Sequence, residues 1–134
     1  MKLSAKNLMT DFIRTFPFLK DEIDKVVDWA GGEYYHIIFG QVFNPYIKEV
    51  LLNDFSDISK KTKVVQFLES MAISDDCDVK AILTDSILEE LLDYPDEFDR
   101  IEPYFLEKTA ALLPPIKDFF KYDDRRNPIR EGRD

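Results

Sequence analysis

Apolar residues recur with helical spacing along nearly the whole chain, and this periodicity most constrains what the chain can fold into. Val64, Leu68 and Met71 stand four and then three residues apart, which places them on one face of a helix. Strand-like alternation is nearly absent, and the 134 residues include only four glycines. The sequence therefore predicts an all-α fold.

Prolines and polar breaks divide the chain into about seven expected helices with short connections. Ser4 is the expected N-cap of the first helix. The predicted ranges are 4–16, 19–29, 34–52 with a kink near Asn44-Pro45, 60–73, 78–92, 96–102, 104–113 and 115–121. A strand over 34–39 is the alternative for that segment, because aromatic and β-branched residues cluster there. The wide apolar stripe of 78–92 predicts a central helix.

Short connections make neighbouring helices antiparallel, which fits a small helical bundle or a HEAT/armadillo-like superhelix. The length predicts one domain. We expect residues 1–121 to form this single helical domain and the polar residues 122–134 to be a flexible tail.

Cysteine and histidine each occur once, as Cys77 and His36. One cysteine allows no internal disulfide, and two nitrogen or sulfur ligands are too few for structural zinc. The N-terminus lacks an apolar leader, and the longest uncharged run, Tyr34–Ile47, has 14 residues where a membrane span needs about 20. We expect a cytoplasmic protein without a cofactor.

Three short patterns invite a chemical interpretation, and each is incomplete. Glu33 and His36 have the spacing of a di-iron ligand pair, but such sites need a second copy. The run 75–78 begins like a calcium loop, but Ala81 and Ile87 stand where glycine and glutamate are required, so a helix cap is the better interpretation. Cys77 and His36 lack a third group and a glycine-rich turn. We expect no enzyme; if the chain were one, Glu33, His36 and the adjacent tyrosines would be the first candidates.

Acidic residues outnumber basic ones by 27 to 18, and residues 1–120 hold 23 acidic against 13 basic residues. Such a body repels phosphate backbones and anionic lipid, so we expect no nucleic-acid or membrane partner. Seven of the acids lie within 14 residues, with Arg100 as the only base. The aromatic residues Tyr94 and Phe98 lie among them, and Tyr104 follows just after them. The candidate binding residues are Glu89, Glu90, Asp93, Tyr94, Asp96, Glu97, Asp99 and Glu102. The alternative is a solvated helix face with Phe98 turned to the core.

Four stretches carry a resemblance to known proteins. These are Val64–Ala72, Asp75-Asp76, Ser86–Asp93 and Tyr104–Thr109. Over about residues 64–113 the chain resembles small helical bacterial immunity proteins of contact-dependent inhibition and related toxin systems. The resemblance implies a cytoplasmic inhibitor that covers one toxin domain, often a nuclease, and it implies no catalytic residue.

The acid excess agrees with that implication, because nucleases that bind phosphates are commonly basic. The sequence therefore favours an immunity protein that neutralises a cationic toxin domain by covering its active or substrate-binding surface. The acidic stretch would steer the partner, and Tyr94 would anchor it. The alternative is a helical adaptor or regulatory protein that binds another cytoplasmic protein.

Overall fold

The computed structural model describes residues 2–121, and every regular element in this range is helical. The α-helices are α1 (Leu8–Thr15), α2 (Lys20–Ala30), α3 (Tyr35–Ile38), α4 (Asn44–Leu52), α5 (Ile58–Ala72), α6 (Cys77–Ala81), α7 (Glu89–Leu92), α8 (Pro95–Ile101), α9 (Glu107–Ala111) and α10 (Leu113–Lys121). Short 3₁₀ turns, η1 (Pro17–Leu19) and η4 (Glu102–Tyr104), and π-helical segments, η2 (Phe39–Phe43) and η3 (Ile82–Leu88), complete the order. The all-α prediction is confirmed, and residues 2–121 contain no strand over 34–39 or elsewhere. The predicted tail, 122–134, lies outside the described residues.

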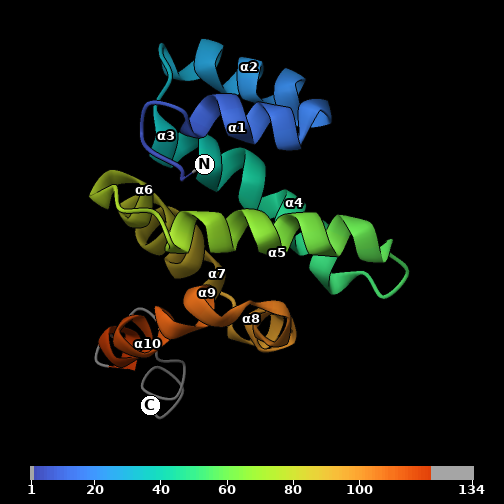
Figure 1. Ribbon diagram of the computed structural model, residues 1–134. Helices are drawn as coiled ribbons and strands as arrows, with labels where there is room; N and C mark the ends of the chain where they lie inside the picture. Colours follow the sequence, from blue (N-terminus) through green and yellow to red (C-terminus); the bar gives the residue numbers. More distant parts are fainter. Residues whose placement is uncertain (1, 122–134) are drawn as a thin grey trace, which may run out of the picture.

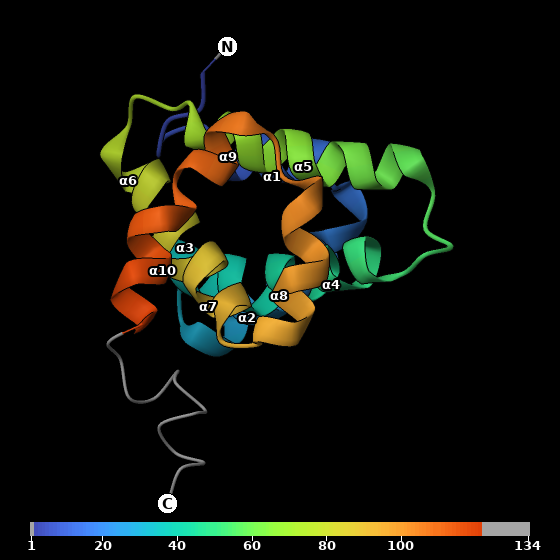
Figure 2. The same cartoon turned by 90° about the horizontal axis from the view of Figure 1, so that it is seen from below.

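The helices stack in successive layers from one end of the molecule to the other (Figure 1). Helices α1 and α2 form one end, α3 to α6 the middle, and α7 to α10 the other end. Helix α4 packs against α5 and α8, and α5 packs against α9, which Figure 2 shows beside it. Within residues 2–121, no helix is both long enough and apolar enough to span a membrane.

A cluster of phenylalanines joins the first layers. The Phe12 ring lies 4.6 Å from the Phe39 ring, 5.0 Å from that of Phe43 and 5.6 Å from that of Phe67, measured between centroids. All four side chains are buried, so α1, η2 and α5 share one aromatic core. Helical spacing predicted that Phe12 and Phe67 lie on apolar faces, but it did not decide whether the aromatic segment 34–47 is core or exposed. The structure buries Phe39 and Phe43 of that segment beside them.

Local sequence signals predicted the end of the second helix correctly but not the start of the first. Helix α2 stops at Gly31, whose φ of 80° belongs to the left-handed region that glycine adopts without strain. The expectation that Ser4 caps the first helix is wrong, because α1 begins at Leu8 and Asn7 takes the cap position. The Asn7 Oδ1 atom accepts a hydrogen bond from the Ser4 backbone at 2.8 Å, so residues 4–7 form a separate turn.

Two long helical stretches each contain a π-helical segment. Residues 35–52 run through η2, so the expected irregularity near Asn44-Pro45 is a π-helical segment that ends at Phe43. Pro45 is the second residue of α4, in the first turn where proline is tolerated. Residues 77–92 run through η3, which the periodicity did not predict. The two segments pack against each other, and the Asn44 side chain donates a 2.9 Å hydrogen bond to the Ser86 carbonyl. The stripe on 77–92 is buried as predicted, with Val79, Ile82, Leu83, Ile87, Leu88 and Leu91 all in the core.

Two carboxylates fasten distant parts of the chain to the middle layer. Asp76 accepts a hydrogen bond of 2.7 Å from the backbone N–H of Ala5, 71 residues away. Glu69 accepts three hydrogen bonds of 2.9 Å each, from the N–H of Lys108 and from the N–H and hydroxyl of Thr109. These bonds satisfy the free N–H groups at the start of α9 and hold that helix on α5.

Candidate protein-binding face

The acidic stretch of the sequence occupies α7, α8 and η4, in the layer at one end of the molecule (Figure 1). We call this surface the acidic face. Phe98 and Ile101 turn inward from α8 and bury themselves, which leaves the charged positions of the helix on its outer side. The exposed members are Glu90, Asp93, Tyr94, Asp96 and Asp99, while Glu89, Glu97 and Glu102 are half-buried.

Part of the negative charge is balanced within the fold. The Lys48 ammonium lies 3.1 Å from Glu97 Oε1, and the Lys117 ammonium lies 2.9 Å from Glu102 Oε1. The Arg100 guanidinium donates a hydrogen bond to the Leu52 carbonyl at 2.9 Å. Glu97 and Glu102 thus help to join α8 and η4 to their neighbours, in addition to any role at the surface.

Two carboxylates on α8 keep their charge available. Asp96 and Asp99 are exposed and have no ion pair among residues 2–121. Lys48, which pairs with Glu97, and Arg100, which donates to the Leu52 carbonyl, are both bound elsewhere. The acidic face therefore presents uncompensated negative charge, and this charge can steer a cationic partner.

Tyr94 is the most exposed of the three aromatic residues of the stretch. Its side chain is 56% exposed, whereas Phe98 is 1% exposed and belongs to the core. The Lys48 ammonium lies 3.7 Å from the centroid of the Tyr94 ring, so a cation–π contact holds the ring in place. A ring that is already positioned loses little entropy when a partner covers it.

Tyr104, the third aromatic residue of the stretch, turns toward α5. Its hydroxyl lies 3.3 Å from the ammonium of the buried Lys61. Lys61 is therefore turned inward, while its neighbours Lys60 and Lys63 are exposed. The structure thus separates the three aromatic residues: Tyr94 is exposed at 56%, Phe98 belongs to the core, and Tyr104 is 36% exposed with its hydroxyl directed to Lys61.

His36 and Glu33 do not meet a second set of ligands. The Nδ1 atom of His36 forms a short hydrogen bond with the Ser86 hydroxyl, which links α3 to η3. Burial raises the pKa of the neighbouring Tyr35 phenol, and the Glu33 carboxylate adds to that rise. Ser86 itself is 5% exposed whereas His36 is exposed, so this pair joins two helices at the edge of the core, and the Ser86 hydroxyl is not open to a substrate.

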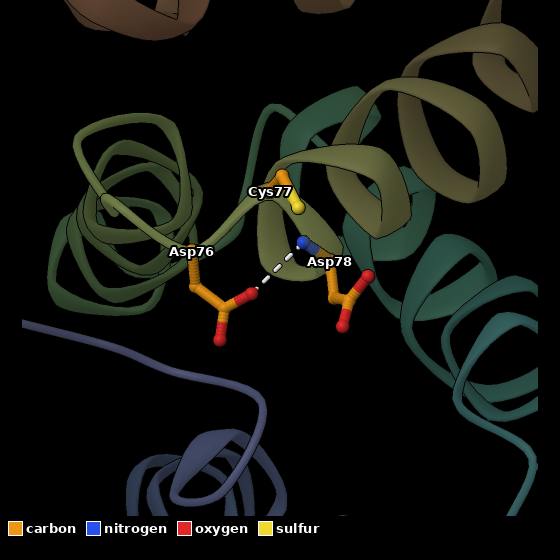
Figure 3. A group of neighbouring side chains, drawn as sticks. All are labelled: Asp76, Cys77 and Asp78. Carbon is orange, nitrogen blue, oxygen red and sulfur yellow. Dashed lines mark hydrogen bonds between the residues drawn. The ribbon is translucent and has the colours of Figure 1, made fainter.

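Asp76, Cys77 and Asp78 form the one group of three ligand-type side chains close together within residues 2–121 (Figure 3). The geometry is that of a helix cap. Asp76 accepts hydrogen bonds from the backbone N–H groups of Ala5 and Asp78, and these bonds hold its pKa below the ordinary value. The predicted cap at 75–78 is confirmed, because the Asp76 carboxylate is already used by the start of α6.

A family match covers most of this architecture. Residues 9–120 match a domain of unknown function, DUF7674. The chain belongs to the DUF7674 family. No curated protein and no solved structure matches the chain. The matched range of this DUF7674 domain contains the whole acidic face and runs from α1 to α10.

Sequence reasoning missed a second surface of the DUF7674 domain. Three shallow hollows lie in a row between α2 and the η2–α4 stretch. Phe18 stands at one end and Trp29 at the other, and both are strongly exposed. A signal was present, because both residues lie off the inward stripe of Ile23 and Val27, but periodicity alone does not say which neighbour faces them.

Proposed function

We propose that this protein is a binding protein for a cationic protein domain, in the class of immunity proteins that cover a toxin nuclease. The observation that carries the proposal is the acidic face, where Asp96 and Asp99 present uncompensated charge on the helix that begins directly after the braced ring of Tyr94. Carboxylates without internal partners accelerate encounter with a basic surface, and a fixed aromatic ring supplies contact area once the two surfaces meet.

Inhibition by such a protein requires no chemistry of its own. A basic surface that binds phosphates is covered when an acidic domain occupies it, and the substrate is then excluded by both volume and charge. The proposal places the chain in the cytoplasm, where a toxin nuclease would meet its substrate. It needs no metal or cofactor on this chain.

Co-expression with the toxin-like domain encoded by the neighbouring gene tests the proposal. Survival of the cells together with a co-purifying complex supports it. Death of the cells, or survival without a complex, refutes the immunity role. In that case the helical adaptor becomes the better proposal, and its partner is sought by pull-down at low salt.

Charge reversal then locates the surface. The variant Asp96→Lys/Asp99→Lys should slow association with the co-purifying partner by about tenfold or more at low salt, because steering depends on local charge. The matched control, Asp21→Lys/Asp28→Lys, changes the net charge equally at exposed positions of α2, which forms the opposite end of the molecule (Figure 1). Equal slowing by both variants would place the interface elsewhere.

A further inference from the structure

The three hollows beside α2 form one continuous groove. The first, of about 300 Å³, and the second, of about 180 Å³, share Leu19, Tyr46 and Glu49 in their walls. The second and the third, of about 190 Å³, share Glu22 and Gln41. Since α2 has 11 residues, the groove is about 16 Å long at about 1.5 Å per residue.

The groove has an apolar floor and aromatic ends. Leu19, Val42 and Tyr46 lie along the floor and are each less than 10% exposed. Phe18 at one end is 59% exposed, and Trp29 at the other is 74% exposed. Helix α2, which carries Trp29 and follows the turn of Phe18, lies at the outer end of the stack (Figure 1). Large rings exposed at both ends of an apolar floor are typical of binding surfaces.

The charges along the groove are unevenly balanced. Lys25 lies 3.3 Å from Glu22 and largely offsets its charge. Glu49, which lines the first two hollows, has no ion pair among residues 2–121, although Lys60 stands at the end of the first hollow. Its carboxylate also raises the pKa of the Tyr46 phenol, where burial is the larger cause. The lining itself holds two acids and two bases. The surplus of negative charge comes from helix α2, which forms one wall and carries four acidic residues against two basic ones, with Asp21 and Asp28 exposed outside the lining.

We propose that this groove, lined by Leu19, Tyr46 and Glu49 and ended by Phe18 and Trp29, is a docking site for a basic amphipathic helix of a partner protein. Apolar side chains one turn apart would cover the floor, and a lysine or arginine between them would meet Glu49. The groove lies apart from the acidic face, so this inference does not depend on the function proposed above.

A helix fits this surface better than an extended segment. Residues 2–121 offer no strand edge to which an extended peptide could add, whereas two helices side by side form a groove into which the side chains of a third helix pack. A groove of about 16 Å matches about three turns of helix.

Trp29 makes a direct test possible, because it is the only tryptophan of the chain. Two synthetic peptides of about 14 residues serve as probes, both with the same leucine stripe on one helical face. One carries lysines on its polar face and the other carries glutamates. With the lysine peptide we expect the Trp29 emission to move to shorter wavelength and to become less accessible to acrylamide. The glutamate peptide should leave both properties unchanged.

Variants of exposed groove residues decide where the peptide binds. We expect Phe18→Ser to raise the Kd of the lysine peptide by about tenfold and Glu49→Lys to raise it by about fivefold. Both titrations are made at 0.15 M salt, where charges separated by more than about 8 Å are largely screened from each other. The acidic-face variant Asp96→Lys/Asp99→Lys should bind the lysine peptide with a Kd within about twofold of that of the parent protein. Far-ultraviolet circular dichroism confirms that each variant is folded.

Either of two results overturns the inference. One is a Trp29 spectrum that does not respond to the lysine peptide, or responds equally to both peptides. The other is binding that survives Phe18→Ser and Glu49→Lys but is lost in the acidic-face variant, which would assign the peptide to that face instead. Failure of the toxin co-expression leaves these titrations unaffected, so the two proposals fail separately.

Discussion

Replacement of Glu69 by alanine tests the idea that one carboxylate fastens α9 to the rest of the fold. The variant removes three hydrogen bonds of 2.9 Å, two of them made by Thr109. Thr109 is 0% exposed, so water does not replace the partner of its N–H and hydroxyl groups. The N–H of Lys108 is exposed and can turn to water instead.

The magnitude follows from these environments. A buried donor without a partner costs about 1–3 kcal/mol, and an exposed bond contributes under about 1 kcal/mol. Some relaxation of α9 lowers the sum, so we expect Glu69→Ala to reduce the free energy of unfolding by about 3 kcal/mol. For a domain of this size that is a fall in Tm of about 10 °C. Glu69→Gln keeps one acceptor oxygen and should cost about 1 kcal/mol.

The same carboxylate makes stability depend on pH. Burial raises the pKa of Glu69, but the hydrogen bonds from Lys108 and Thr109 outweigh it, so the pKa lies below the ordinary value of 4.5. A lowered pKa means that the folded state binds this proton less readily than the unfolded state. The contribution of Glu69 is therefore complete above pH 4.5 and is lost as the pH falls through the folded-state pKa. Glu69→Gln should flatten this part of the acid dependence.

Urea denaturation followed by circular dichroism at several pH values measures both effects. Glu107 provides the control, because it lies at the start of the same helix but is exposed, and we expect Glu107→Gln to stay within about 0.5 kcal/mol of the parent. A loss below about 0.5 kcal/mol in Glu69→Ala, or an acid dependence that Glu69→Gln leaves unchanged, would refute the reasoning.

Two further variants test the other contacts that hold the layers together. Asp76→Asn should lower the urea midpoint at pH 7, because the variant loses the negative charge that accepts hydrogen bonds from the Ala5 and Asp78 N–H groups. The pKa of Asp76 is lowered in the folded protein, so the parent loses the same charge only as the pH falls below 3.8, and the difference between the two proteins should shrink there. Phe12→Ala should cost about 3–5 kcal/mol in urea denaturation, because Phe12 contacts the rings of α1, η2 and α5 in the core, and a loss near 1 kcal/mol would mean that the cavity closes.

Much of the fold could be predicted from local sequence signals. Apolar spacing located the helical stretches to within a few residues, and Gly31 ends α2 where the glycine pair predicted a stop. The helix cap at Asp76 could also be predicted, because a carboxylate just before a helix accepts hydrogen bonds from backbone N–H groups two or three residues further on. These features depend on residues that are neighbours along the chain.

The candidate site was predictable only in part. The sequence located the acidic face and its aromatic residues, but it did not separate exposed Tyr94 from buried Phe98 or from Tyr104 beside Lys61. It did not predict that Lys48, about 50 residues earlier, pairs with Glu97 and braces Tyr94. The groove beside α2 was missed because its two walls come from segments whose packing angle no local pattern encodes.

The sequence by itself determined the all-α class, the approximate helices, the helix cap at Asp76 and the concentration of acidic residues in α7 and α8. Tertiary structure alone decided which carboxylates keep their charge, which aromatic rings remain exposed, and that Glu69 and Asp76 fasten α9 and the N-terminal segment. The physical reason is range. Helix formation and capping depend on groups within a few residues, whereas burial and ion pairing depend on contacts between segments that only the packed chain brings together.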